Sequence, residues 1–257
     1  MLEFKNVSFK YPEDNYVMME NLSFSVPDHA FVSIIGASGC GKSTIFRLIN
    51  GLEKPDQGDI LVDGQSIASL KQYSAFMPQK DMLFPWRTIE KNLCLPMEMQ
   101  HIPKAEQQKR CKEVLEQVGL SDYLKKYPKD LSGGMKQRVA VARALALESD
   151  VLLLDEPFGA IDPRLRLELQ ELVSRLCTEN QKTVVFVTHD IDEAILLADR
   201  IVVMEPGKIR TVLPVEFPHP RKRESLMGTE GYEILHRKLI ASFYAHVEDN
   251  IDAEVAL

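Results

Sequence analysis

The sequence has no long hydrophobic run. Its unbroken apolar stretches, such as VLLL at 151–154 and VVFV at 184–187, fall far short of the roughly 20 apolar residues that span a bilayer. The N-terminus, MLEFKNVSFKY, lacks the basic segment followed by an apolar one that a secretory signal requires. We therefore expect no transmembrane segment and no signal peptide, so work at a membrane would need another chain to span it.

Positive charge is also in the minority. The 31 lysines and arginines are outnumbered by 38 aspartates and glutamates, which gives a formal net charge of −7. This balance argues against a nucleic-acid partner bound through a basic face. A local basic cluster such as PRKRE at 220–224 is predicted to be a solvated turn.

Cysteines are few and are not paired along the sequence. Cys40, Cys94, Cys111 and Cys177 are scattered singly, without a CxxC pair or histidines at metal-ligand spacing. This pattern indicates a reducing cytosol and no zinc site. Repeats and low-complexity tracts are absent too, so the 257 residues are expected to form one domain with an insertion.

Three short, branched apolar segments predict strands that are buried on both faces of a parallel sheet. They lie at 31–35, 151–154 and 183–187. The first ends at Gly36, the second at Asp155 and the third at Thr188-His189. Because parallel strands share one carboxyl edge, where ligands of α/β sheets bind, we expect Gly36, Asp155 and His189 to converge.

Other segments have other periods. Alternating residues within 1–75, with a hairpin turn at Asp63-Gly64, predict a small antiparallel sheet. From 88 to 147 the period is helical, and Cys111, Val114, Leu115 and Val118 share one helix face. A second helix is predicted over 135–147. The tail has Tyr232, Leu235, Leu239, Phe243 and Val247 at helical spacing, which predicts a docked terminal helix.

A glycine-rich segment after the first predicted strand carries the clearest chemistry. GASGCGKS fits the phosphate-loop pattern GxxxxGK[ST], whose backbone wraps around phosphates at a helix N-terminus. Lys42 can bridge the β- and γ-phosphates, Ser43 can ligate Mg²⁺, and Thr44 can reach the α-phosphate. The expected nucleotide-binding residues are Gly36, Ala37, Ser38, Gly39, Cys40, Gly41, Lys42, Ser43 and Thr44.

Polar residues after the other strands complete a hydrolytic site. Asp155 ends a buried strand and can hold Mg²⁺ directly or through water, while Glu156 can polarise an attacking water. His189 can hydrogen-bond a γ-phosphate or orient that water. Gln79, at a predicted strand-to-loop boundary, can ligate a metal through its amide oxygen. Lys42, Glu156 and His189 are therefore the predicted catalytic residues.

A second glycine loop, LSGGMKQR at 131–138, is one phosphate cradle more than a single nucleotide needs. Together with the phosphate loop, Gln79, LLLDEP, GAID and His189, all in family order, it closely resembles the nucleotide-binding subunit of an ABC transporter. The resemblance covers about 1–215. It implies an α/β fold, with a phosphate-loop (RecA-like) parallel-sheet core, a small antiparallel β subdomain, an inserted helical subdomain over about 88–147, and a short C-terminal extension at 216–257.

The family resemblance also implies roles for these residues. ATP would be bound with Mg²⁺, the metal being held by Ser43, Gln79 and Asp155, and Glu156 would be the general base. Tyr11 matches the aromatic residue that stacks on adenine, with Tyr16 as the alternative. Asp162 would communicate between two sites across a dimer.

The second glycine loop has a place in such a dimer. In the family two subunits face head to tail, and the signature of one closes over the ATP on the phosphate loop of the other. The corresponding residues here are Ser132, Gly133, Gly134 and Gln137. Together with the helix that begins near Met135, they would act on the nucleotide of a second ATPase subunit, which is expected to be identical to the first. The second cradle would thus belong to the neighbour's nucleotide.

The segment QKDMLFPWRTIEKNL at 79–93 indicates the branch of the family. It resembles ATPases of nitrate, sulfonate, taurine and thiamine-precursor importers. This implies a peripheral subunit on the cytoplasmic face of the membrane, permease subunits docking near Gln79 to Asn92, and an extracytoplasmic solute-binding protein. An exporter or lipoprotein-release ATPase is the alternative. A soluble ABC ATPase of DNA repair or translation is a further one, disfavoured by the single cassette and the absence of a coiled-coil insertion.

Overall fold

The computed structural model describes residues 1–12, 17–159 and 161–255, with side chains as far as residue 243. The alternative adenine-stacking residue Tyr16 lies outside the described residues. The chain divides into two compact units, Met1–Lys71 with Thr183–Leu257, and Gln72–Lys182. The phosphate loop belongs to the first unit and the signature loop to the second.

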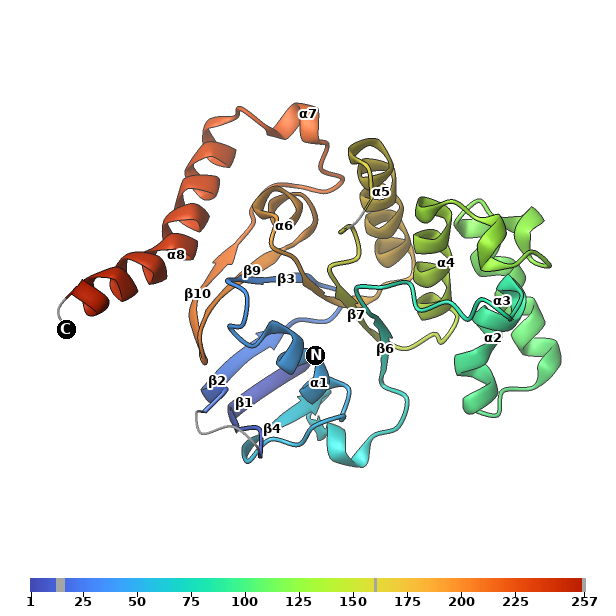
Figure 1. The fold of residues 1–257 in the computed structure, drawn as a ribbon, viewed down its shortest axis with the longest axis horizontal. Helices are drawn as coiled ribbons and strands as arrows, with labels where there is room; N and C mark the ends of the chain where they lie inside the picture. Colours follow the sequence, from blue (N-terminus) through green and yellow to red (C-terminus); the bar gives the residue numbers. More distant parts are fainter. Residues whose placement is uncertain (13–16, 160, 256–257) are drawn as a thin grey trace. The chain divides into compact units, whose positions relative to one another are not determined.

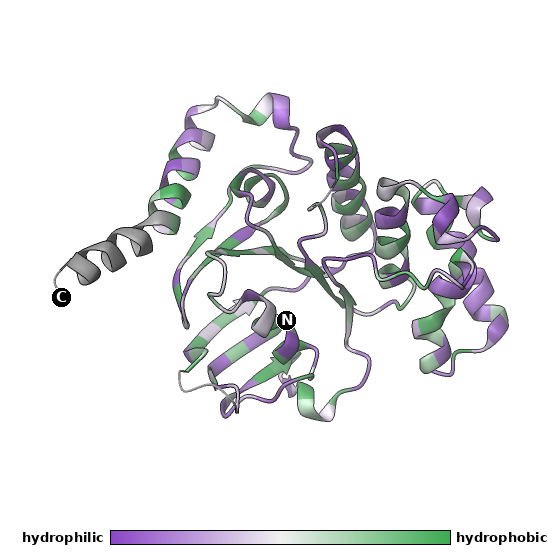
Figure 2. Ribbon diagram, viewed as in Figure 1, coloured by the Kyte–Doolittle hydropathy of each residue, from purple (hydrophilic) through white to green (hydrophobic). Residues whose placement is uncertain are grey.

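The first unit contains the predicted antiparallel sheet. Its strands are β1 (Leu2–Phe9), β2 (Met19–Val26), β4 (Gln57–Val62) and β5 (Gln65–Ser66), in the order β2-β1-β4-β5. Buried residues recur along β1 and β2 with interruptions at irregularities of the strand pairing, and Figure 2 shows hydrophobic and hydrophilic bands along both strands. The hairpin turn at Asp63 and Gly64 is confirmed, because both have positive φ angles, 51° and 77°.

A second sheet of the first unit carries the phosphate loop. Its strands β10 (Lys208–Pro214), β9 (Arg200–Glu205), β3 (Phe31–Gly36) and β8 (Thr183–Val187) lie in this order, and Figure 1 labels the first three. β3 is parallel to both β8 and β9, and β10 is antiparallel to β9. Every residue of β3 is buried, so the apolar run at 31–35 is confirmed as a strand that is buried on both faces. Helices α1 (Lys42–Ile49) and α6 (Ile191–Leu197) follow β3 and β8 along the chain.

The tail forms two helices of the first unit, α7 (Arg223–Leu226) and α8 (Glu230–Val255). α8 packs against α6 and β9. Tyr232 is 3% exposed and Leu239 is fully buried, so the predicted docking of a terminal helix is confirmed through these two residues. The side chain of Val247 lies outside the described residues.

The basic cluster at 220–224 is predicted to be a solvated turn, and for Arg221 this is wrong. The Arg221 side chain is 2% exposed, and its guanidinium donates hydrogen bonds to four main-chain carbonyls. Two of those carbonyls belong to Ile195 and Ala198, more than twenty positions before Arg221, so no sequence pattern near 221 shows these two contacts. Burial lowers the pKa of Arg221, and nearby Asp199 acts in the opposite direction.

The second unit pairs two parallel strands and holds four α-helices among its described residues. β6 (Ser74–Met77) is parallel to β7 (Val151–Asp155). The helices are α2 (Ile89–Met99), α3 (Lys104–Gln117), α4 (Gly133–Leu145) and α5 (Pro163–Glu179). Figure 2 shows hydrophobic and hydrophilic residues alternating around α5, as for a helix with one buried side. Short 3-10 turns occur at Ile67–Ser69 in the first unit, and at Ser121–Tyr123 and Pro128–Asp130 in this one.

Helices α2, α3 and α4 pack on one another in pairs. The predicted helix face of Cys111, Val114, Leu115 and Val118 is buried. The second predicted helix begins at Gly133, two residues before Met135, because Ser132 caps it: the Ser132 hydroxyl accepts a hydrogen bond from the Met135 amide at 3.4 Å. The predicted domain boundaries at 88, 147 and 215 stay predictions.

Candidate functional site

The phosphate loop connects β3 to α1, and two of its glycines are required by the backbone. A Cβ on Gly36 would lie 2.7 Å from both Cys40 Sγ and the Met204 carbonyl oxygen, so only glycine fits there. Gly41 has a φ of 108°, a conformation that side chains strongly disfavour, and it stands at the N-cap of α1. Since no side chain among the described residues caps α1, its first amides are available to an anion.

Lys42 folds back over this loop. Its ammonium donates hydrogen bonds to the carbonyl oxygens of Gly36 at 2.7 Å and of Ala37 at 2.9 Å. The positive charge is therefore held against the loop that would wrap the phosphates. Burial raises the pKa of the neighbouring Cys40 thiol although Lys42 acts against this, which keeps the sulfur uncharged at neutral pH.

Tyr11 lies beside the phosphate loop. Its hydroxyl is 3.1 Å from Oγ1 of Thr44, and its ring makes an edge contact with Phe9 at 4.8 Å between centroids. An aromatic ring is thus fixed next to Thr44, as a stacking partner for a base would require. The role of Tyr11 in adenine stacking stays a prediction.

His189 follows the strand that neighbours β3. Val187 pairs with Ile34 in the parallel ladder, and the Thr188 amide donates to the Ile34 carbonyl at 3.3 Å. The chain ends of β3 and β8 therefore lie side by side, which brings Gly36 and His189 to one edge of the sheet. Asp155 belongs to the other unit, so its predicted convergence with these two stays a prediction.

In the second unit, Gln79 and Glu156 are in direct contact. The Gln79 side-chain amide donates a hydrogen bond to Glu156 Oε2 at 2.8 Å. Glu156 follows Asp155, the last residue of β7, and has a φ of 44°. A left-handed backbone at a residue other than glycine stores strain of about 1–3 kcal/mol and is typical of functional sites. Two predicted site residues are thus brought together, with their side chains oriented by one another.

The signature loop caps α4. Gly133 would have no atom within 4 Å of an added Cβ among the described residues, so this face of the loop is open. Gly134 is more enclosed, because its Cβ would meet Leu165 at 3.0 Å. Oε1 of Gln137 is buried, and within the described part of the chain it has no hydrogen-bond partner. Asp162 caps α5 by accepting a hydrogen bond from the Leu165 amide at 3.1 Å.

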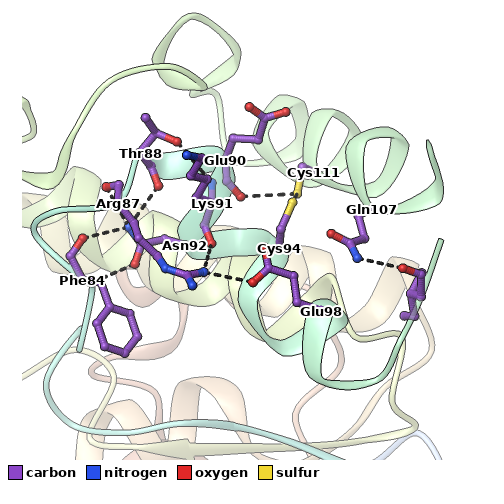
Figure 3. Close-up of polar contacts among 11 residues, drawn as sticks. Phe84, Arg87, Thr88, Glu90, Lys91, Asn92, Cys94, Glu98, Gln107 and Cys111 are labelled. Atoms are coloured by element: carbon purple, nitrogen blue, oxygen red, sulfur yellow. Dashed lines mark hydrogen bonds and ion pairs between the residues drawn. The ribbon is translucent and has the colours of Figure 1, made fainter. Parts of the chain in front are cut away.

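The loop that precedes α2 exposes apolar side chains but is held firmly. Met82 is 62% and Trp86 71% exposed, whereas Leu83 and Phe84 are half-buried. Figure 3 shows how Asn92, which is fully buried, reaches back to this loop. Its side chain accepts from the Phe84 amide at 2.7 Å and donates to the carbonyls of residues 84, 87 and 88 at 3.0–3.1 Å.

A second side chain connects the same loop to the signature helix. Arg143 on α4 donates to the carbonyl oxygens of Asp81 at 2.7 Å and Met82 at 2.9 Å. Burial lowers its pKa, with Asp81 acting against this. Sequence spacing does not reveal Arg143, because its partners are main-chain atoms about sixty positions away. Sequence reasoning names Asn92 only as the end of the docking segment. Its position four residues after the helix cap Thr88, in TIEKN, is nevertheless visible in the sequence.

The predicted metal ligands are a hydroxyl (Ser43), an amide oxygen (Gln79) and one carboxylate (Asp155). Over the residues that the structure describes, no cluster of three or more histidine, cysteine or acidic side chains forms a metal site. A ligand set with a single carboxylate still fits Mg²⁺, which keeps several waters and binds through substrate phosphates with few protein groups. It does not fit zinc, which needs several nitrogen or sulfur ligands.

A phosphate loop between a buried parallel strand and a helix defines a phosphate-loop nucleotide-binding protein. A family model described as ABC transporter matches residues 19–159. The chain belongs to this family, and it is an ATPase that binds ATP. The predicted α/β phosphate-loop fold is thereby confirmed.

Named relatives agree with this assignment. The chain is 42% identical to the aliphatic sulfonates import ATP-binding protein SsuB of Bacillus cereus, over 88% of each chain. It is 40% identical to the nitrate import ATP-binding protein NrtD of Synechococcus elongatus, over 94% of this chain and 91% of that one. Among solved structures, the ATP-binding cassette MJ0796, in a dimeric post-hydrolysis state bound to ADP and Pi, has a TM-score of 0.73 and 32% identity, covering 85% of this chain and 100% of the other.

No helix within the described residues is both long enough and apolar enough to span a membrane.

Proposed function

We propose that this chain is the ATP-hydrolysing subunit that powers the import of small organic or inorganic anions through a membrane ABC transporter. The observation that supports this best is the similarity, over almost the whole chain, to ATPases named for sulfonate and nitrate import. The loop at 79–92, predicted to be the permease-docking segment, exposes Met82 and Trp86 as such a role needs.

We further propose that hydrolysis takes place in a dimer. One copy would hold ATP through its phosphate loop and Lys42, and the signature of a second copy would close over that nucleotide. The open face of Gly133 supports this, because the first amides of a helix lack partners within it and can approach a phosphate closely. The solved cassette of similar fold is itself dimeric. Asp162, beside the first turn of α5, would communicate between the two sites.

Within each composite site, the side chains have separate tasks. Lys42 would neutralise charge on the β- and γ-phosphates, and His189 would orient the γ-phosphate or the water. Glu156 would accept a proton from the attacking water, with Gln79 orienting its carboxylate. Ser43, Gln79 and Asp155 would hold Mg²⁺, which supplies charge neutralisation between phosphate oxygens. Tyr11 would stack on the adenine.

The partners follow from this arrangement. Permease subunits would dock at Gln79 to Asn92 and carry the transmembrane segments, while an extracytoplasmic binding protein would deliver the solute. The chain would then work as a peripheral subunit on the cytoplasmic face of the membrane. No nucleic acid is needed at any step.

An uptake assay tests the importer proposal against the alternative of an exporter or lipoprotein-release ATPase. Cells in which the gene carries Lys42→Ala should lose the uptake of one labelled anion among a sulfonate, nitrate and bicarbonate, and regain it with the wild-type gene. Unchanged uptake of all three, together with intracellular accumulation of a solute or retention of a lipoprotein, would instead support export.

A further inference from the structure

Helix α6 begins two residues after His189 and is held at both ends by the C-terminal extension. All the groups concerned belong to the first unit. At the start of α6, Asp192 is the shared partner of three side chains. At the end of α6, Arg221 binds its last carbonyls. The extension is thus attached to the helix that follows the predicted catalytic histidine.

The Asp192 side chain is only 22% exposed and contacts three other side chains. Arg223 donates to Oδ2 at 2.9 Å, the Tyr232 hydroxyl donates to Oδ1, and His236 Nε2 lies 3.5 Å from Oδ1. Tyr232 also stacks on His236, with ring centroids 5.6 Å apart. Burial raises the pKa of Tyr232, and the hydrogen bond to Asp192 adds to this, so the hydroxyl stays a donor at neutral pH.

Arg221 closes the opposite end of the helix. Its Nη1 donates to the carbonyl oxygens of Ile195 at 3.0 Å and Ala198 at 2.5 Å, while Nη2 and Nε bind carbonyls of residues 215 and 217. The last carbonyls of a helix lack partners within the helix and attract positive charge. Since Arg221 also binds the chain that leads into the extension, α6 and the extension are fastened to each other.

The connection from α6 to His189 is short and rigid. Thr188 Oγ1 donates to Glu193 Oε2 at 2.7 Å, and both side chains are buried. The Asp190 amide donates to Thr188 Oγ1 at 3.0 Å, and Asp190 caps α6 through the Glu193 amide at 3.1 Å. Both neighbours of His189 are therefore tied to the first turn of α6, so a displacement of α6 would displace His189.

We infer that the segment 219–239 is a positioning element for His189: by holding α6 through Asp192 and Arg221, it fixes the imidazole for ATP hydrolysis. This rests on the proposed role of His189 in the reaction. Asp192, Arg221 and Tyr232 are positioning residues, because they act through α6 and do not touch the nucleotide. The extension thereby gains a function beyond the docking that its helical spacing predicts.

The test compares Asp192→Asn and Tyr232→Phe with the control Glu233→Gln, whose side chain is exposed on α8 next to Tyr232. Both test variants keep the side-chain shape and weaken the hold on α6 without emptying the core. We expect kcat for ATP to fall about threefold to tenfold while KM and the affinity for a fluorescent ATP analogue stay within about twofold. The control should keep the wild-type kcat.

Two further results decide the inference. In a His189→Ala background, Asp192→Asn should not lower the residual release of radiolabelled phosphate any further, because its effect passes through His189. Unchanged kcat in both test variants, an equal fall in the control, or a full additional fall in the His189→Ala background would overturn the inference. If His189→Ala alone left kcat at the wild-type value, this would instead contradict the proposed role of His189 itself.

Discussion

The Gln79 side-chain amide donates a hydrogen bond to Glu156 Oε2 across 2.8 Å, joining two residues 77 positions apart in the sequence. One oxygen of the carboxylate is thereby fixed, and its orientation is set by a neutral group that does not quench its charge. A general base benefits from this, because orientation toward a water is as important as basicity. Glu156 is further constrained by its φ of 44°.

Replacing Glu156 by Gln should preserve ATP binding and lower turnover by more than about a hundredfold, because the proton acceptor is lost while the shape is kept. The variant should accumulate as an ATP-bound dimer, which gel filtration with light scattering would detect. Lys42→Ala is the matched control and should fail to form that dimer. Full ATPase activity in Glu156→Gln would contradict the general-base assignment.

Mixing two inactive variants tests the cross-dimer site. A Lys42→Ala protomer mixed with a Ser132→Arg protomer should regain activity, because one of the two composite sites then has an intact phosphate loop and an intact signature. Phosphate release by the mixture is compared with that of each variant alone. If the mixture is as inactive as its components while the wild type is active, a single intact composite site is not sufficient for hydrolysis. The cross-dimer site then needs another explanation, such as obligatory coupling of the two sites.

Trp86→Ala should weaken association with the permease more than it weakens ATP binding, because a large exposed ring is a typical anchor of an interface. Trp86 is the single tryptophan of the chain, so its fluorescence should also shift to shorter wavelength when the permease binds. Met99→Ala, on α2 at 76% exposure, is the control and should leave association unchanged. Equal loss of both affinities for Trp86→Ala would favour a packing role.

Asn92→Ala should destabilise the second unit by about 2–4 kcal/mol, because a buried side chain that hydrogen-bonds to four main-chain groups is removed. Urea unfolding measures the loss, and the anisotropy of Trp86 fluorescence should fall as the loop loosens. Lys91→Ala, at the exposed neighbouring position, should change stability by less than about 0.5 kcal/mol. Unchanged anisotropy in Asn92→Ala would show that other contacts hold the loop.

Much of the fold could be predicted because its signals are local. The runs at 31–35, 151–154 and 183–187 form β3, β7 and β8, and the helix face around Val114 is buried as its period predicts. Helix boundaries are harder to predict. The start of α4 lies two residues before its predicted position, because the cap by Ser132 depends on a single hydrogen bond that the hydrophobic period does not show.

The sequence by itself determined the chemistry. The phosphate loop and the acidic pair after a buried strand each lie within a few consecutive residues, so together they predict binding of phosphate and Mg²⁺, whereas the role of the signature loop is implied by the family resemblance. Only the tertiary structure decided what holds these groups in place. Arg221 belongs to a basic cluster that is typical of a solvated turn, yet it lies buried against α6, where it binds the carbonyls of Ile195 and Ala198, more than twenty positions away, as well as two nearby carbonyls. Contacts of that kind depend on which distant segments the fold brings together, and local residue spacing does not encode this.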